Sequence, residues 1–337
     1  MNPVELGLGF QSDKSWRDYE RLATAAEAYG FDVLSVFGDL YFGPPVPALL
    51  AMARATARVR LGPACLNPFT VHPVEIAGQI AALDEASGGR AFLGLARGSW
   101  LGDLGITQAR AIDAVAEAAA VVRALLAGEG EAVAGTHFSL PPGTHLRPTP
   151  LRGVVPVLVG TWGPRLARRA RAFADELKVG GCANPAMAGV VRAWLAPEPD
   201  VRNVARRVRV VLGAVTVVDV DGDAARRRAR EEVAMYLDVV AALDPTVETD
   251  PELLARLHER VAAGDRVGAG ALVPAELLDR FAFAGTPAEV TEHALAVFAA
   301  GADRIEFGTP HGLTDDGGVA LLGEQVLPAV RAALGMA

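Results

Sequence analysis

The chain has 337 residues, of which 51% are hydrophobic, and its formal net charge at pH 7 is −8. The acidic balance argues against nucleic acid or an acidic membrane surface as a broad partner, so any anionic ligand must meet local positive charge. No apolar run reaches the roughly 18 residues of a membrane span. The first ten residues lack the basic segment of a signal peptide. With two cysteines, Cys65 and Cys182, in no metal-ligand spacing, the chain is predicted to be cytoplasmic.

Short apolar runs alternate with amphipathic stretches along the whole chain. Strands are predicted at 4–10, 33–37, 59–64, 91–96, 155–159, 177–179, 208–218 and 304–307. Helices are predicted between them, at 16–29, 47–57, 74–86, 108–127 and 319–334 among others. Such alternation indicates an α/β protein with a parallel sheet. Eight strand–helix units favour closure into a (β/α)8 TIM barrel over an open doubly wound sheet.

The chain is longer than the roughly 250 residues of a plain barrel, so it must carry insertions. A stretch at about 130–152 is rich in Pro, Gly and Thr and is predicted to be irregular. A longer charged stretch at about 224–283 contains helical patches at 226–243 and 252–263. It forms an insertion after strand 7, where it could cover the barrel mouth. No repeat or flexible linker divides the chain, so we expect one domain over residues 1–337.

Active sites of TIM barrels lie on the loops that follow the strands, and here glycine follows nearly every predicted strand. A single glycine usually makes a tight turn. The whole set instead favours a wide mouth where a large flat ligand approaches the backbone. The sequence shows no nucleophile elbow, metal-ligand cluster, phosphate-binding P-loop or dinucleotide fingerprint. A bound cofactor that carries its own chemistry is therefore the economical hypothesis.

The fifth unit carries the sharpest local signal. The run Gly160, Thr161, Trp162, Gly163, Pro164 and Arg165 begins a helix, and Pro164 suits its first turn. Free backbone N–H groups and the helix dipole make such a turn an anion site. Cations there oppose the dipole, so Arg165 is predicted to neutralise a phosphate. Arg168, Arg169 and Arg171 fit a phosphate site and a solvated basic face equally well.

Other strand-end residues offer weaker signals. Arg97, Gly98 and Ser99 after the fourth strand add a guanidinium, backbone amides and a hydroxyl, and Gly180 and Gly181 follow the sixth. Asp39, the acid after the second strand, is a candidate for proton transfer or for binding a polar ring edge, with a turn cap as the alternative. His311, after the eighth strand, faces the mouth in principle but is more simply a solvated loop residue. Three further residues are predicted to be structural: His72 and Gly88 as caps and Arg90 in packing.

Several ordered motifs resemble luciferase-like monooxygenases. The resemblance lies in residues 61–73 and 82–95 and continues through 125–129, 157–164 and 174–175. Residues 306–312 and 321–324 are most similar to the methylenetetrahydromethanopterin reductase group of that superfamily.

The resemblance implies a barrel that holds the deazaflavin coenzyme F-420, or alternatively FMN, at its mouth. It implies a bulge with a non-proline cis peptide at Ala64, Cys65 and Leu66, with Asn67 beside it, that backs the ring. The cofactor phosphate would lie at residues 97–99 and 160–165, and Asp39 would be what remains of an acid–histidine pair. The implied activity is hydride transfer between F-420 and a small organic substrate, in an enzyme that forms a homodimer.

Two alternatives stay open at this stage. One is an FMN-dependent monooxygenase that uses oxygen and receives reduced flavin from a partner flavin reductase. The other is a non-catalytic flavin-binding barrel. The sequence also departs from the reductase pattern: Gly9 stands where that group has a first-strand glutamate, Glu5 lies earlier toward the barrel floor, and Glu176 replaces a glycine.

Overall fold

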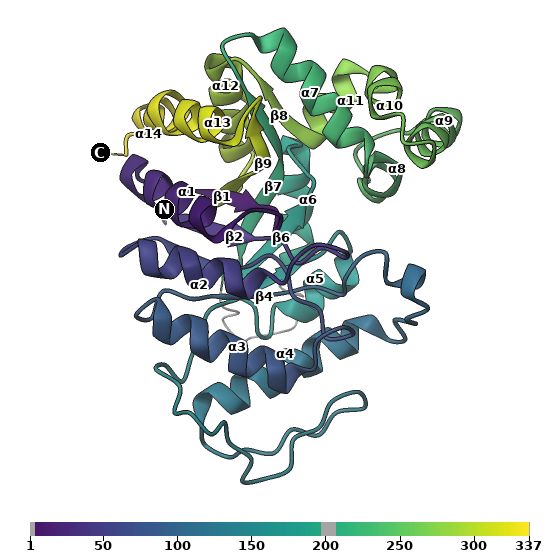
Figure 1. Ribbon diagram of the computed structural model, residues 1–337. Coiled ribbons are helices and arrows are strands. Elements are labelled where there is room, and N and C mark those ends of the chain that lie inside the picture. The colour runs from purple at the N-terminus through teal and green to yellow at the C-terminus, as the bar shows by residue number, and fades with distance from the viewer. Residues whose placement is uncertain (1–3, 197–206, 337) are drawn as a thin grey trace.

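The computed structural model describes residues 4–196 and 207–336; residues 1–3, the start of the segment examined for a signal peptide, lie outside it. Its centre is a parallel sheet that curls into a barrel, with helices packed around the outside (Figure 1). The strands are β1 (Glu5–Phe10), β2 (Val33–Val36), β3 (Arg60–Pro63), β4 (Leu93–Leu95), β5 (Val157–Gly160), β6 (Glu176–Gly180), β7 (Arg209–Val218), β8 (Ala282–Gly285) and β9 (Arg304–Gly312).

Eight of these strands form the barrel in the order β3-β2-β1-β9-β7-β6-β5-β4. The first and last strands of that order, β3 and β4, meet only through two isolated bridges, Leu61–Ala91 and Leu66–Leu95. The barrel is therefore nearly closed, and the eight-stranded TIM-barrel prediction is confirmed.

The outer layer consists of helices that follow the strands. They are α1 (Trp16–Tyr29), α2 (Pro45–Ala55), α3 (Pro73–Ala86), the short turn η1 (Leu101–Leu104), α4 (Ala111–Ala127), α5 (Pro164–Ala170), α6 (Pro185–Leu195), α12 (Pro287–Ala299), α13 (Asp315–Leu321), the π-helical turn η3 (Leu322–Val326) and α14 (Leu327–Ala333). Local capping sets several ends. Ser15 accepts a hydrogen bond from the Asp18 N–H at the start of α1, and Gly30, at φ 96°, ends it. No helix in the described ranges is long and apolar enough to cross a membrane.

The predicted insertion after strand 7 is confirmed and forms a lobe beside the barrel mouth (Figure 1). It contains α7 (Gly222–Ala234), α8 (Leu237–Val240), η2 (Ala241–Leu243), α9 (Pro251–Ala262), α10 (Arg266–Leu272) and α11 (Ala275–Phe281). Buried side chains such as Leu257, Leu278 and Phe281 give it an apolar cluster of its own. The sequence analysis missed the ninth strand, β8, which pairs in parallel with β7. Four residues, two of them alanine, are too short a run to mark a strand without this pairing.

The other predicted excursion, at 130–152, is irregular apart from one antiparallel bridge between Val133 and Leu140. The Glu117 carboxylate on α4 anchors it by accepting hydrogen bonds from the N–H groups of Thr136, His137 and Phe138 at 2.6–3.0 Å.

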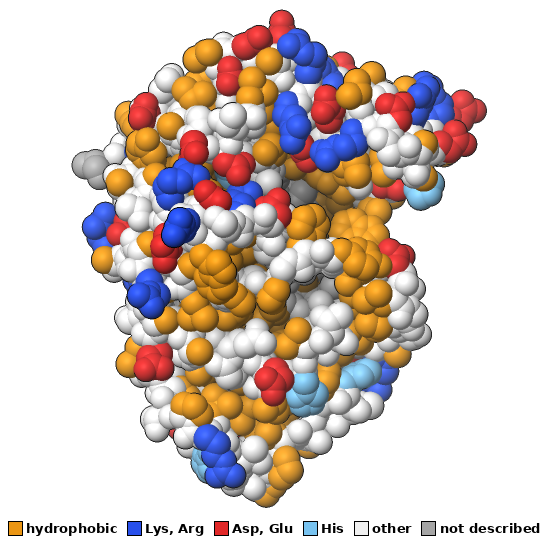
Figure 2. All heavy atoms as spheres, in the orientation of Figure 1, with side chains coloured by type: hydrophobic (Ala, Val, Ile, Leu, Met, Phe, Trp, Pro, Cys, Tyr) orange, Lys and Arg blue, Asp and Glu red, His pale blue; other side chains and the backbone are white. Residues whose placement is uncertain are grey.

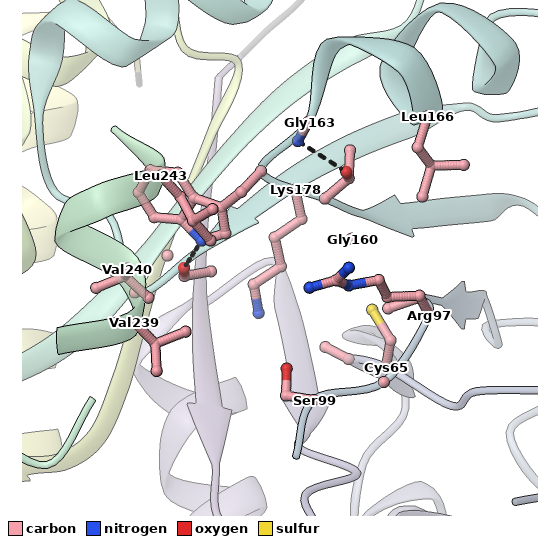
Figure 3. A pocket seen from close by; sticks show the side chains of 18 of the residues that line it. Cys65, Arg97, Ser99, Gly160, Gly163, Leu166, Lys178, Val239, Val240 and Leu243 are labelled. Atoms are coloured by element: carbon pink, nitrogen blue, oxygen red, sulfur yellow. Dashed lines mark hydrogen bonds between the residues drawn. The ribbon is translucent and has the colours of Figure 1, made fainter. Parts of the chain in front are cut away.

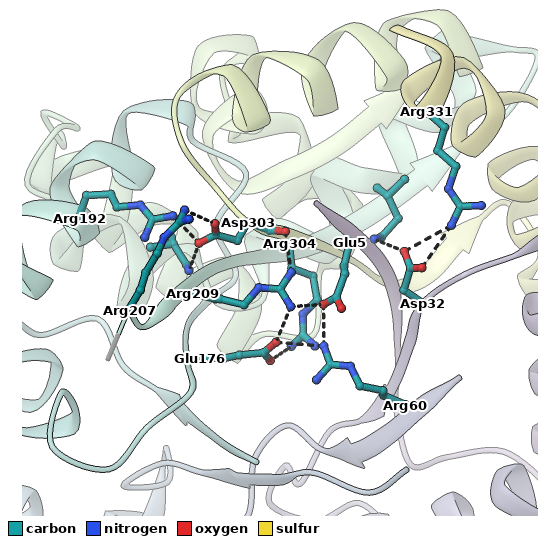
Figure 4. Close-up of polar contacts among 12 residues, drawn as sticks. Glu5, Asp32, Arg60, Glu176, Arg192, Arg207, Arg209, Asp303, Arg304 and Arg331 are labelled. Carbon is teal, nitrogen blue, oxygen red and sulfur yellow. Dashed lines mark hydrogen bonds and ion pairs between the residues drawn. The ribbon is translucent and has the colours of Figure 1, made fainter. Parts of the chain in front are cut away.

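Charged side chains close the barrel floor, where the strands begin, and two of them, Glu176 and Arg304, are buried (Figure 4). Glu5 binds Arg60 at 2.6 Å and Arg209 at 2.7 Å, while Glu176 binds Arg60 at 3.0 Å and Arg304 at 3.1 Å. Arg304 has no exposed surface, and its guanidinium lies 5.6 Å from the centroid of the Phe92 ring. Glu5 therefore belongs to the ion-pair cluster at the barrel floor, as its early position in β1 predicted.

Removal of one charge from this floor cluster is expected to be costly. Burial raises the pKa of Glu176, but the charges of Arg304 and Arg60 outweigh it and hold that pKa below its usual value of 4.5. Glu176→Gln would leave Arg304 buried without its partner, so the free energy of unfolding should fall by about 3–5 kcal/mol. Denaturant unfolding at pH 7 measures this. Glu20→Gln, an exposed acid on α1, is the matched control, and an equal loss in both variants would contradict the assignment.

The lowered pKa of Glu176 also predicts that the stability of the fold depends on pH. Because the pKa of Glu176 is lower in the folded chain than its usual 4.5, its stabilising effect is fully present above that pH and is lost as the pH falls through the folded value. The melting temperature of the wild type should therefore drop more steeply below pH 4.5 than that of Glu176→Gln.

Candidate active site

One cavity of about 1030 Å³ opens at the carboxyl ends of the barrel strands. Figure 2 shows the surface hollowed beneath the insertion lobe, with hydrophobic side chains around the opening. The structure brings most of the sequence-predicted site residues to its wall: Asp39, Ala64, Cys65, Arg97, Gly98, Ser99, Gly160, Thr161, Trp162, Gly163, Pro164, Arg165, Gly180 and Gly181. Their roles in cofactor binding stay predictions, but their convergence on one cavity is observed.

The turn after β3 forms one side of the cavity. The peptide bond between Ala64 and Cys65 is cis, as the family resemblance implied. A Cβ atom placed on Gly160, at the end of β5, would lie 3.0 Å from Cys65 Sγ. The absence of a side chain at Gly160 therefore leaves room for the thiol. Gly180, on the sixth turn, is different: a Cβ there would meet nothing within 4 Å. The wall at Gly180 is therefore open space that a flat ligand can occupy.

Two predicted site residues lie elsewhere. Leu66 is buried in the core, where it bridges Leu95 of β4, because closure of the barrel draws it inward. Asn67 stabilises the following turn, since its side-chain oxygen accepts hydrogen bonds from the N–H groups of Phe69 and Thr70 at 3.1 and 3.0 Å. Asn67 faces a smaller neighbouring cavity of about 180 Å³, which Asp39 also borders.

The turn after β5 is held in place by its own side chains. Thr161 Oγ1 accepts a hydrogen bond from the Gly163 N–H at 3.0 Å. Trp162 Nε1 donates one to the Gly180 carbonyl oxygen at 2.7 Å, which ties the fifth and sixth turns together. Arg165 and Arg169 border the cavity on this side.

The cations at the cavity are unequal. Arg110 is paired with Asp113 at 2.8 Å. Over the part of the chain that the structure describes, Arg97, Arg165 and Arg169 are exposed and form no ion pair. Arg168 and Arg171, which the sequence left undecided, do not border the cavity. The mouth thus carries guanidinium groups available to an anion, although the whole protein is acidic.

Asp39 lies on the rim with its carboxylate bound by Gln11 Nε2 at 3.0 Å. The surrounding protein atoms raise its pKa, and the Gln11 hydrogen bond and the charge of Lys178 only partly offset this. A carboxyl group with a raised pKa is suited to hold a proton nearer neutral pH.

The sequence analysis missed the charged residues at the bottom of the cavity. Lys178 of β6 and Glu306 of β9 both border it, and the Lys178 ammonium donates a hydrogen bond to Glu306 Oε1. Figure 3 shows Lys178 extending into the cavity, with Arg97 and Cys65 on one side and Val239 and Val240 on the other. A signal was present, because each is a charged residue inside a short apolar strand of a parallel barrel, where charge is costly.

The insertion lobe supplies the remaining wall, which confirms that it reaches the mouth. Tyr236, Val239, Val240 and Leu243 border the cavity opposite the third turn. The Tyr236 hydroxyl donates to the Phe281 carbonyl oxygen at 3.1 Å, so this wall is fixed to the rest of the lobe.

The two histidines considered in the sequence analysis, His72 and His311, are structural. His72 caps α3 by accepting from the Val74 N–H at 3.3 Å, as predicted. The interpretation of His311 as a solvated loop residue was wrong. β9 continues to Gly312 because its pairing with β7 does, through Val217–His311, so His311 is fully buried against Phe10. Burial lowers the pKa of His311 to about 4, and the ring is neutral at pH 7.

The remaining structural assignments also hold. Gly88 has the positive φ, 64°, expected of the residue that ends α3. The Arg90 guanidinium donates to the Val59, Ala53 and Thr56 carbonyl oxygens at 2.7–3.0 Å and so packs α2 against β3. No cluster of His, Cys, Asp or Glu that could hold a metal ion occurs among residues 4–196 and 207–336.

Fold and cavity together define a TIM-barrel-like protein whose site lies at the C-terminal mouth. The chain belongs to the luciferase-like monooxygenase family, whose model matches residues 3–304. It is therefore an enzyme of the flavin- and deazaflavin-dependent oxidoreductases.

Individual relatives are similar over nearly their whole length. The 5,10-methylenetetrahydromethanopterin reductase of Archaeoglobus fulgidus is 28% identical, covering 97% of this chain and 100% of the relative. The F420-dependent glucose-6-phosphate dehydrogenase of Nakamurella multipartita is 28% identical, covering 99% of each. The structure of the coenzyme F420-dependent tetrahydromethanopterin reductase from Methanopyrus kandleri superposes with a TM-score of 0.86 at 23% identity, covering 97% of this chain and 99% of that one.

The two thiols are expected to be unreactive in the folded protein. Burial raises the pKa of Cys65 to about 12 and also raises that of Cys182. At pH 8 only about one Cys65 thiol in 10⁴ would be ionised, and the thiolate is the nucleophile. Ellman's reagent should therefore label neither residue quickly in the native protein and both after denaturation in guanidinium chloride. A thiol that reacts within the mixing time before denaturation would contradict this description of the third turn.

Proposed function

We propose that the chain is a coenzyme F-420-dependent oxidoreductase that transfers a hydride to or from a small organic substrate. The observation that carries the proposal is the charge of the cavity mouth. Arg97, Arg165 and Arg169 border it, and the described parts of the chain offer them no ion pair, in a protein of net charge −8. The tail of F-420 carries a phosphate and carboxylates, which guanidinium groups bind well.

The residues present fit such a cofactor. The open wall at Gly180 and the cavity volume of about 1030 Å³ leave room for a flat ring. Ala64 and Cys65 would lie behind the ring, and the neutral Cys65 thiol places no negative charge there. Arg97, Ser99 and Arg165 would hold the phosphate. When bound, the deazaflavin ring supplies the carbon that gives or takes the hydride.

The insertion lobe would exclude water from the reaction, because Val239, Val240 and Leu243 present apolar side chains to the cavity. Asp39, on the opposite rim, would bind the polar edge of the ring or pass a proton to it.

The relatives support the cofactor more than the substrate. The names of the Methanopyrus kandleri and Nakamurella multipartita proteins specify F420, but their substrates, a pterin and a sugar phosphate, are unlike one another. The cofactor is the feature these relatives have in common, so it is the one extended to this chain.

Cofactor binding and its dependence on Arg165 can be tested by titration. Oxidised F-420 should quench tryptophan fluorescence, since Trp100 and Trp162 border the cavity, with a Kd on the order of 10 µM or below. Arg165→Ala should weaken binding by about tenfold or more, equivalent to ~1.4 kcal/mol, and salt should diminish the difference. Arg168→Ala removes the same charge from a neighbouring exposed residue that does not border the cavity, and should change Kd less than about twofold.

A parallel titration with FMN decides between the rival functions. Binding of FMN without F-420, together with oxygen uptake by the reduced complex, would reverse the proposal in favour of a flavin-dependent monooxygenase. Tight binding of F-420 without reduction of any small organic substrate tested would contradict the proposed hydride transfer.

A further inference from the structure

A buried ion pair forms the bottom of the cavity, at the centre of the barrel. Lys178 is 5% exposed and Glu306 is 1% exposed, yet both border the cavity. Ser35 Oγ of β2 donates a hydrogen bond to Glu306 Oε2 at 2.6 Å, so both carboxylate oxygens are bound. The Lys178 ammonium also lies 5.0 Å from the centroid of the Phe37 ring.

Glycines on neighbouring strands make the space for this pair. A Cβ on Gly9 of β1 would lie 2.9 Å from Glu306 Oε1, and one on Gly213 of β7 would lie 3.0 Å from Lys178 Cε. Glu306 thus lies over Gly9, where β1 has no side chain of its own. The Glu306 carboxylate binds the Lys178 ammonium, and both residues border the cavity.

Stability does not explain the pair. A buried ion pair contributes little net stabilisation compared with apolar residues of similar size. The barrel floor already has its own charge cluster around Glu176 and Arg304. Within the described ranges, Glu306 is the one hydrogen-bond acceptor that Nζ has in the protein, although an ammonium carries three N–H donors. The remaining donors are available to a ligand in the cavity.

The choice of lysine is informative. The chain contains 32 Lys and Arg residues, and only two are lysine, Lys14 and Lys178, so the other 30 are arginine. Arginine stays protonated in proteins, whereas a lysine ammonium can release its proton and take it back. Among the cationic residues that line the cavity in the described structure, Lys178 is the one that is buried beside a carboxylate.

We propose that Lys178 is the group that gives the substrate its proton during reduction and takes it back during oxidation, with Glu306 and Ser35 as positioning residues. The inference rests on the proposed hydride transfer and names its substrate class: a carbonyl or imine on the oxidised side, an alcohol or amine on the reduced side.

A carbonyl substrate gains a hydride on its carbon and a proton on its oxygen. When bound, the reduced deazaflavin would supply the hydride for the new C–H bond and would return to its oxidised form by losing its N–H proton to solvent. The π electrons of the C=O bond would move to oxygen. A Lys178 N–H bond breaks as its proton forms the O–H bond, which leaves a neutral amine beside the Glu306 carboxylate. A proton from solvent at the cavity mouth restores the ammonium. Oxidation of the alcohol runs each transfer in reverse.

Lys178 variants test the proton transfer. With reduced F-420 and a panel of small aldehydes, ketones and imines, Lys178→Met should lower kcat by about 100-fold or more. Its Kd for F-420 should stay within about threefold of wild type, because Arg97 and Arg165 hold the anionic tail. Lys178→Arg keeps the charge but cannot give up a proton, so it should be as impaired as Lys178→Met. Lys178→Ala should regain activity with added ethylamine. Lys14→Arg is the matched control, because Lys14 lies in the loop after β1, pairs with Asp13 and Asp315 and does not border the cavity.

A second measurement needs neither cofactor nor turnover. In Lys14→Arg protein labelled with [15N]lysine, the single Nζ signal belongs to Lys178 and should be visible at pH 7, because the protons of a buried, ion-paired ammonium exchange slowly. Glu306→Gln should remove or broaden that signal.

The possible failures are distinguishable. A wild type that does not bind F-420 removes the proposed function before any variant is made. A wild type that binds F-420 but reduces no member of the panel overturns the substrate class. Turnover by Lys178→Met or Lys178→Arg within about threefold of wild type, or an Nζ signal unaffected by Glu306→Gln, overturns the role of Lys178 and leaves the proposed function standing.

Discussion

The register of β9 is the constraint on which both ends of the barrel depend. This strand hydrogen-bonds β1 on one side and β7 on the other, and so closes the sheet between its N-terminal and C-terminal halves. Arg304 and Glu306 stand two residues apart on it, so their side chains point to the same, inner face. A slip of one residue would turn both outward and would remove the floor cluster and the cavity pair together.

Neighbouring strands accommodate this register. Glu306 lies beside Gly7 of β1 and Gly213 of β7, two positions without side chains, so a carboxylate fits where a barrel interior is normally filled. Below it, Arg304 is compensated by Glu176 at 3.1 Å and stacks near Phe92. The barrel interior thus holds a floor of paired charges and, two residues further along β9, a charged pair that borders the cavity.

The insertion lobe adds an independent layer to the site. Its own apolar cluster around Leu257 and Phe281 allows it to stand beside the barrel rather than merge with the core. Through Tyr236 and Val240 it completes a wall that the barrel strands alone would leave open. The cavity therefore combines a rigid polar bottom from the strands with an apolar cover from a separately packed lobe. Such a division suits a reaction that needs fixed charges and little water.

Local sequence determined much of this protein. Alternating apolar runs identified the eight barrel strands and glycine-rich turns identified the mouth, because each is set by neighbours along the chain. The cis peptide at Ala64–Cys65 was instead implied by the family resemblance. Pairing between distant strands decided the rest. β8 is a strand because it pairs with β7. His311 is buried because the pairing of β9 with β7 extends past Phe307. Lys178 and Glu306 are 128 residues apart and meet only because β7 holds β6 and β9 in register on either side of it. A charge inside an apolar strand is visible in sequence, but its partner is chosen by the closure of the barrel.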